Sequence, residues 1–187
     1  MIPALYDKFK HWSEKGSVYI ISDTHFDDED CHLMDPHWLP AQEHTDILKK
    51  IVHKTDTLIV LGDVGNIEYF KQIKGYKVLL MGNHDTGSTK YKEVFDEVYE
   101  GPLMIGEKLF LSHEPIPNIN WCLNIHGHDH SNSINDEFHI NLASNVCNYI
   151  PLNLGKYIKE HGLKNIKSLH RDIIDRATVK KSKGGKK

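Results

Sequence analysis

The side chains best able to do chemistry stand in five short polar clusters along the chain. Each cluster follows a short apolar run within a residue or two. Ligands of open α/β sheets bind outside the carboxyl ends of the strands, so clusters placed after strands could converge on one crevice. In chain order the clusters are Asp23-Thr24-His25, Gly62-Asp63, Gly82-Asn83-His84-Asp85, His113-Glu114 and Gly127-His128-Asp129-His130.

The residue types in these clusters favour metal ions. Carboxylate, imidazole and amide oxygen without thiolate suit Mn²⁺, Fe or Zn²⁺, with Ni²⁺ as a further alternative, rather than a structural zinc site. Asp23 and His25 are two residues apart, as are His128 and His130. In extended backbone this spacing sends both side chains to the same side, so each pair could bind a single ion. Two cations roughly 3.5–4 Å apart can clamp the attacking and leaving oxygens of a displacement at phosphorus.

Each cluster by itself also has a structural interpretation. Asp-x-His after a strand is commonly a cap or a turn, and Gly-Asn-His-Asp is a plausible turn because Gly and Asn tolerate positive φ. His113 could be a buried, hydrogen-bonded histidine. The order of the clusters, each behind a predicted strand, favours the metal site. Gly62, Gly82 and Gly127 directly precede candidate ligands, where the missing Cβ permits close approach of the backbone.

The elements that must position these clusters can be read from the apolar pattern. Runs of aliphatic residues without polar alternation indicate strands buried on both faces at 18–21, 58–61, 78–81, 109–111 and 123–125. Further strands are expected at 138–142 and 146–150, and residues 103–105 and 108–111 predict a hairpin. Helices are expected at 1–15, 43–53, 66–73, 90–98, 154–161 and near 168–176. The alternation of strands and helices predicts an α/β layered fold.

Length and composition indicate one soluble domain. The chain has 187 residues and a formal net charge of −3, and no apolar run approaches the ~18 residues of a membrane span. We expect a single domain over residues 1–177 and a basic, disordered tail over 178–187. Three widely spaced cysteines fit neither a disulfide framework nor a Cys-x-x-Cys zinc site, so a reducing cytosol is the expected compartment.

The five clusters resemble, in order, those of the calcineurin-like metallophosphoesterase superfamily, and its small single-domain bacterial and phage members are most similar. The resemblance runs from about Val18 to Pro151. It implies a four-layer αββα sandwich with two mixed sheets and a centre of two divalent ions. It also implies the ligand sets. The first ion would take Asp23, His25 and His130, the second Asn83, His113 and His128, and Asp63 would bridge both.

The same resemblance gives His84 and Asp85 catalytic roles. His84 would lie beside the metals without binding them, where it can protonate the leaving oxygen or steady the phosphate. A free histidine near its ordinary pKa is a suitable general acid at neutral pH. Asp85 would orient and stabilise that imidazole. The implied nucleophile is a metal-bridging hydroxide, because coordination lowers the pKa of water.

One loop departs from the pattern of the small relatives. Many of them continue Asp-Thr-His-Phe with Gly-His, whereas this chain has Asp27-Asp28-Glu29-Asp30. Carboxylates there would repel a polyanion, which argues against binding of nucleic acid polymers. The alternative interpretation, which we favour, is a solvated loop. His32 and His37 are candidate substrate contacts.

The expected function is therefore hydrolysis of a small phosphodiester, such as a cyclic nucleotide, or of a phosphomonoester. The expected partner is that small substrate, without a stable nucleic-acid complex and without a membrane. A protein phosphatase is the enzymatic alternative, because an uncapped site also admits a phosphorylated loop. A scaffold that has lost catalysis is the alternative from another class, and the presence of His84 and of every expected ligand type argues against it.

Overall fold

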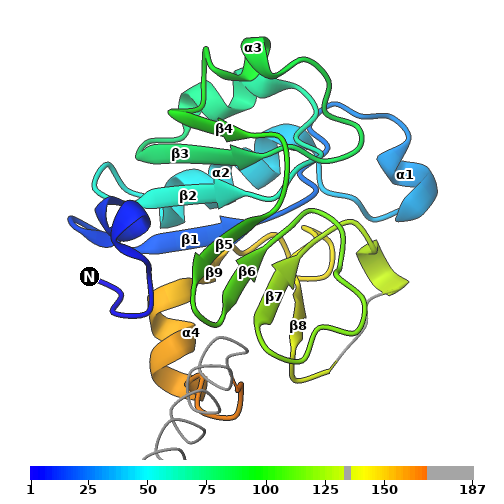
Figure 1. The fold of residues 1–187 in the computed structure, drawn as a ribbon. Helices are drawn as coiled ribbons and strands as arrows, with labels where there is room; N and C mark the ends of the chain where they lie inside the picture. The colour runs from blue at the N-terminus through cyan, green and yellow to red at the C-terminus, as the bar shows by residue number, and fades with distance from the viewer. Residues whose placement is uncertain (133–135, 168–187) are drawn as a thin grey trace, which may run out of the picture.

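Two mixed sheets make up the α/β fold of this protein in the computed structural model, which describes residues 1–132 and 136–167 (Figure 1). The first sheet has the order β4-β3-β2-β1-β9, and the second has the order β5-β6-β7-β8. In the first, β1 (Val18–Ile21), β2 (Thr57–Val60), β3 (Tyr76–Leu80) and β4 (Glu97–Tyr99) are parallel, and β9 (Leu152–Asn153) is antiparallel to β1. In the second, β6 (Leu109–Leu111), β7 (Leu123–His126) and β8 (His139–Asn141) are parallel, and β5 (Leu103–Gly106) forms the predicted hairpin with β6.

The central strands β1 and β2 of the first sheet are largely buried on both faces, as their apolar character predicts. On β1, Val18 and Ile20 belong to the core that also contains Leu111 of β6, whereas Ile21 belongs to a second core with Leu48 of α2 (Ala41–Ile51). Successive side chains point to opposite faces of a strand, so both cores need an apolar residue at every position. Each such side chain contributes about 1.5–3 kcal/mol through burial.

Short helical segments complete the fold. α2, the 3₁₀ helix η2 (Ile67–Gln72) and α3 (Ser88–Tyr91) supply residues to the second core, and α4 (Leu154–His161) packs against β1 and β9. The remaining segments are η1 (Asp7–Ser13), α1 (Cys31–Met34) and η3 (His130–Asn132). Within the described residues, no helix is long and apolar enough to cross a lipid bilayer.

Several predicted elements are wrong or shorter than expected. Residues 146–150 form turns rather than a strand, because Asn148 and Tyr149 have φ of 53° and 60°. The helix expected at 90–98 ends early at Tyr91, and β4 begins at Glu97. The N-terminal helix is the shorter η1. The helix expected near 168–176 and the tail at 178–187 lie outside the described residues.

The parallel order of the strands brings the polar clusters together. The loops after β1, β2 and β3 leave one end of the first sheet, and the loops after β6 and β7 leave the adjoining end of the second (Figure 1). Backbone hydrogen bonds join them: Asp23 N–H donates to Gly62 O at 3.0 Å, and Gly127 N–H donates to His113 O at 2.9 Å.

Candidate metal centre

Two groups of side chains that could each hold a metal ion lie where these loops meet. The first contains Asp23, His25 and His130, and the second contains Asp63, His113 and His128. Within each group the candidate ligand atoms lie within 4.8 Å of one another. Both groups combine residues that follow strands of the first sheet with residues that follow strands of the second. The six residues span 107 positions of the sequence, from Asp23 to His130, and the fold brings them into two compact groups.

Asp63, a member of the second group, also faces the first. Its Oδ2 atom is 3.2 Å from His113 Nε2 in the second group and 3.8 Å from His25 Nε2 in the first. Its Oδ1 atom accepts a hydrogen bond of 2.9 Å from the backbone N–H of His84. One carboxylate oxygen is thus held by the backbone, and the other faces both groups.

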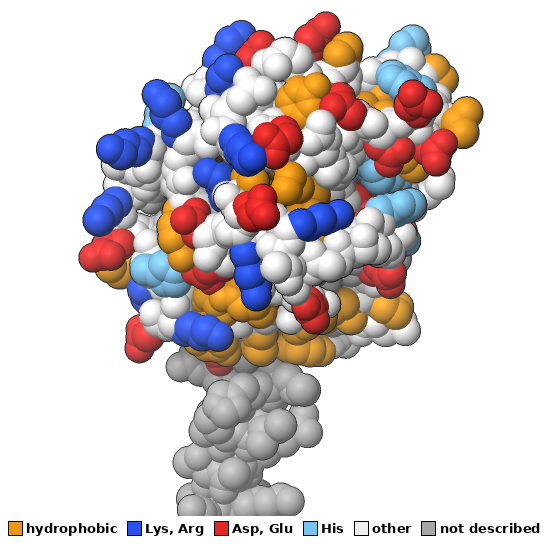
Figure 2. Space-filling view, turned by 90° about the horizontal axis from the view of Figure 1, so that it is seen from above, with side chains coloured by type: hydrophobic (Ala, Val, Ile, Leu, Met, Phe, Trp, Pro, Cys, Tyr) orange, Lys and Arg blue, Asp and Glu red, His pale blue; other side chains and the backbone are white. Residues whose placement is uncertain are grey.

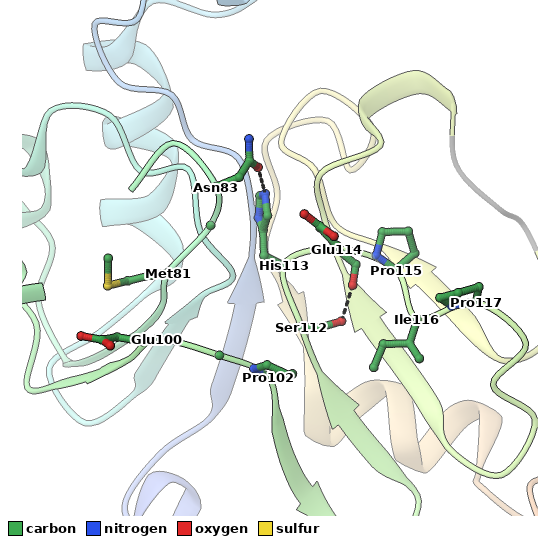
Figure 3. A pocket seen from close by; sticks show the side chains of 12 residues that line it. Met81, Asn83, Glu100, Pro102, Ser112, His113, Glu114, Pro115, Ile116 and Pro117 are labelled. Carbon is green, nitrogen blue, oxygen red and sulfur yellow. Dashed lines mark hydrogen bonds between the residues drawn. The ribbon is translucent and has the colours of Figure 1, made fainter. Parts of the chain in front are cut away.

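The candidate ligand atoms of the second group lie close together. His113 Nδ1 lies 2.7 Å from the carbonyl oxygen of Leu61, which can only accept, so this nitrogen carries the hydrogen. In the neutral ring Nε2 is then a bare acceptor, and it lies 2.8 Å from Asn83 Oδ1 (Figure 3). It also lies 3.2 Å from His128 Nδ1. Asn83 Oδ1 is also 3.1 Å from His128 Nδ1. Asn83 therefore joins this group, and the donor set fits a cation at its centre.

The electrostatics of the second group favour positive charge. Burial opposes protonation of His113, but its hydrogen bond to Asp63 and the charges of Asp23 and Asp63 outweigh burial and raise the pKa of His113 to about 9. For Asp63, burial is likewise outweighed by His113 and by the His84 N–H, and its pKa is lowered. The carboxylates of Asp23 and Asp63 that favour a proton on His113 would equally favour a metal ion bound at the same position.

The first group contains buried candidate ligand atoms that have no hydrogen-bond partner among the described residues. Within the described residues, Asp23 Oδ1 and His25 Nε2 are buried and have no hydrogen-bond partner. The other oxygen of Asp23 accepts from the backbone N–H of His128 at 2.9 Å. Leaving a buried polar atom unpaired costs about 1–3 kcal/mol, so two such atoms beside His130 fit a bound cation.

The backbone at these ligands was not predicted. Asp23, His25, Asp63, His128 and His130 all have positive φ, between 40° and 67°. Residues other than glycine rarely adopt such values, and when they do they cluster at functional sites. The spacing argument that puts His128 and His130 on one ion is wrong: they lie in different groups, which is the division that the family resemblance implies.

Glycines allow the loops that carry the candidate ligands to approach one another closely. Gly62 has a φ of 94°, and a Cβ there would lie 2.5 Å from Gly82 N and 2.7 Å from His113 Nδ1. A Cβ on Gly127 would lie 2.1 Å from Asp23 Oδ2. The glycines that precede the ligands are therefore required by close approach of one loop to the next.

Asp85 has a different role from the expected one. Its carboxylate accepts from the backbone N–H groups of Asp63 at 2.8 Å, Val64 at 3.2 Å and Gly82 at 2.9 Å, and from the Tyr91 hydroxyl at 3.1 Å. Both oxygens are occupied in this way, so Asp85 does not orient the His84 ring. It ties the loop after β2 to the loop after β3.

His84 itself lies at the surface beside the first group. The side chain is exposed, and its ring centroid is 5.6 Å from that of His25. This position is compatible with contact to a substrate.

Trp38, which sequence reasoning missed, packs edge-on against His25 and against His130, with ring centroids 5.7 Å and 5.5 Å apart. An isolated tryptophan outside every motif gave no signal for this contact.

The comparisons with known proteins bear on the fold. No protein-family model matches the chain, and no curated protein matches its sequence. The chain is similar to the crystal structure of the protein of unknown function AQ665 from Aquifex aeolicus, with 28% identity and a TM-score of 0.64 over 77% of this chain and 98% of that chain. It also resembles Pseudomonas putida nuclease MPE, with 21% identity and a TM-score of 0.46 over 64% of each chain. The first similarity shows a shared fold, and the second is too weak to bear on function.

Three hollows open beside the two groups. One of about 450 Å³ contains Asn83 and His113 in its wall (Figure 3). A second of about 360 Å³ is lined by His25, His84 and Lys90. The third, of about 300 Å³, lies between His25, Trp38 and the exposed His32. The structure therefore brings His32 near the centre, whereas the exposed His37 lines none of these three hollows.

Proposed function

We propose that this protein is a two-metal phosphoesterase with the metallophosphoesterase fold, a four-layer αββα sandwich. The observation that carries the proposal is the position of Asp63 Oδ2, which is 3.2 Å from a histidine nitrogen of one group and 3.8 Å from one of the other. A carboxylate oxygen shared in this way supports two neighbouring ions rather than two separate sites. The first ion would be held by Asp23, His25 and His130, the second by Asn83, His113 and His128, with Asp63 common to both.

The ligand types favour Mn²⁺, with Fe, Zn²⁺ or Ni²⁺ as alternatives. Two such ions would supply Lewis acidity and would lower the pKa of water enough to provide a nucleophile for phosphorus at neutral pH. The protein supplies the rest. The backbone N–H of His84 fixes Asp63, and the exposed His84 ring is free to hold a phosphate oxygen or to give a proton to the leaving oxygen.

The surroundings of the centre favour a small ester over a polyanion. The 450 Å³ hollow beside His113 has apolar residues in its wall, including Pro102 and Ile116, and its acidic lining residues are Glu100 and Glu114. In the hollow beside His84, Lys90 is the one lysine or arginine of the lining. Figure 2 shows most of the visible histidines, mixed with carboxylates, on the side where Figure 1 places α1, whereas many lysines lie toward the other side. A phosphodiester or monoester with an uncharged organic group fits this arrangement, since the glutamates repel further phosphates.

Metal loading and a substrate panel test this proposal. After loading with Mn²⁺, elemental analysis should find two ions per chain, and the protein should hydrolyse bis-p-nitrophenyl phosphate. In a panel of 2′,3′-cyclic nucleotides, phosphomonoesters, phosphopeptides and single-stranded DNA, the small esters should give the highest kcat/KM. Fewer than two ions together with no hydrolysis would support a non-catalytic scaffold. Preference for phosphopeptides would identify a protein phosphatase.

Two variants test the division of roles. Asp63→Asn removes the charge shared by both groups and should lower metal content and activity together. His84→Asn should keep two ions per chain and slow turnover, most for esters with poor leaving groups, because the ring is not a ligand. Equal loss of metal in both variants would contradict this assignment.

A further inference from the structure

The acidic loop after β1 is not simply solvated, contrary to the interpretation favoured from sequence. Asp28 Oδ2 lies 2.8 Å from His25 Nδ1, and the His25 side chain is only 2% exposed. Asp27 accepts from Asn66 Nδ2 at 2.9 Å and from the Tyr69 hydroxyl at 3.0 Å. Two of the loop's carboxylates thus accept hydrogen bonds from side chains of the same chain, and the one on Asp28 contacts the buried His25.

The contact with Asp28 decides which nitrogen of His25 is free. An ionised carboxylate only accepts, so the hydrogen of the neutral ring sits on Nδ1, and Nε2 keeps its electron pair. Nε2 is the buried atom without a partner that faces Asp63 Oδ2 at 3.8 Å. A carboxylate behind a ligand histidine fixes its tautomer and orientation and makes the ligand more basic.

From this geometry we infer that Asp28 is a positioning residue for the first metal site, acting through His25. The inference rests on the proposed two-metal function and deepens it, because it assigns the departure from the Gly-His pattern to the metal centre.

Asp28 is itself held in place. Its Oδ1 accepts from the backbone N–H of Asp30 at 3.1 Å, and its carbonyl oxygen accepts from Cys31 Sγ at 2.8 Å. Trp38, which is 4% exposed, also packs edge-on against His25. The imidazole is therefore held by two contacts, and rotation of Nε2 away from the centre would break the one with Asp28.

Neighbouring acidic residues provide a matched control. Glu29 is exposed on the same loop and lines the same hollow as Asp28, so Glu29→Gln removes a similar charge without touching His25. Asp28→Ala removes the acceptor. Asp28→Asn keeps an oxygen that can accept from Nδ1–H but removes the charge.

The test is titration of the metal-free full chain with Mn²⁺ by calorimetry, together with the visible absorption of the Co²⁺-loaded protein. Asp28→Ala should weaken one of two binding steps by about 10–100-fold and alter the Co²⁺ spectrum. Asp28→Asn should give an intermediate Kd, and Glu29→Gln should stay within about twofold of the wild type. Thermal melts of the metal-free variants establish that each is folded.

Several outcomes would overturn the inference. Wild-type Kd values for folded Asp28→Ala, an equal loss in both binding steps, or the same loss in Glu29→Gln would show that Asp28 acts as a general charge or not at all. If the wild type binds two ions and hydrolyses bis-p-nitrophenyl phosphate while Asp28→Ala is unchanged, only this inference fails. If the wild type binds no metal, the proposed function fails with it.

Discussion

Acid should destabilise this protein through His44, which lies outside the candidate metal centre. The residue is on α2 and 1% exposed, and its ring packs edge-on against Phe26 at 5.3 Å and Tyr149 at 5.0 Å. Within the described residues, neither ring nitrogen has a hydrogen-bond partner. Burial disfavours the charged form and lowers the pKa of His44 from 6.5 to about 4.

The sign and size of the effect follow from linkage. The unfolded chain binds a proton at His44 near pH 6.5, whereas the folded chain resists protonation until the pH approaches about 4. Folding stability is therefore unaffected by His44 at pH 8 and falls as the pH is lowered through this interval. The loss is about 2 kcal/mol at pH 5 and about 3 kcal/mol at pH 4.

The variant His44→Leu removes this titration with little change in volume. Urea unfolding of both proteins at pH 7, 6 and 5, in EDTA so that metal does not contribute, gives the free energies of unfolding. The wild type should lose about 2 kcal/mol more than the variant between pH 7 and pH 5. Parallel pH profiles for the two proteins would refute the argument, since they would mean that folded His44 accepts a proton as readily as the unfolded chain.

Two further substitutions have defined outcomes. Burial would raise the pKa of Glu97, but hydrogen bonds from Tyr99, Trp12 and two other side chains outweigh it and lower the pKa. Glu97→Gln should therefore reduce the free energy of unfolding by about 2 kcal/mol at pH 7, by urea denaturation, and by less as the pH falls below about 4.5. Gly127→Ala would place a Cβ 2.1 Å from Asp23 Oδ2 and should cost about 1–3 kcal/mol and reduce Mn²⁺ content. A fully metal-loaded Gly127→Ala variant would contradict the required close approach.

The parts of the fold that depend on burial could be predicted from sequence. Runs such as Val18 to Ile21 need two apolar faces, and that need gives both the strand and its central place in a sheet. The clusters after these strands then converge, because parallel strands end at the same edge. The run at 146–150 looks equally strand-like, but Tyr149 turns back to pack against Trp38, and its hydroxyl oxygen accepts a hydrogen bond from the Leu39 backbone N–H. That contact between distant segments leaves no local signal.

Details that depend on loop backbone could not be predicted. Residue types alone do not signal that Asp23, His128 and His130 adopt positive φ, since Asp and His do so far less often than Gly. The spacing of His128 and His130 suggested a shared ion, whereas the family resemblance implied the two groups in which the structure places them. The hydrogen bonds of Asp28 and Asp85 likewise join segments whose relative positions only the fold defines.

Because each ligand group draws on both sheets, an ion in either one would be a cross-link between the two halves of the molecule. Metal binding would then stabilise the contact between the two sheets as well as supply the chemistry. Without metal, the two sheets would separate more readily. The metal-free chain would then be cleaved by proteases faster than the metal-loaded chain.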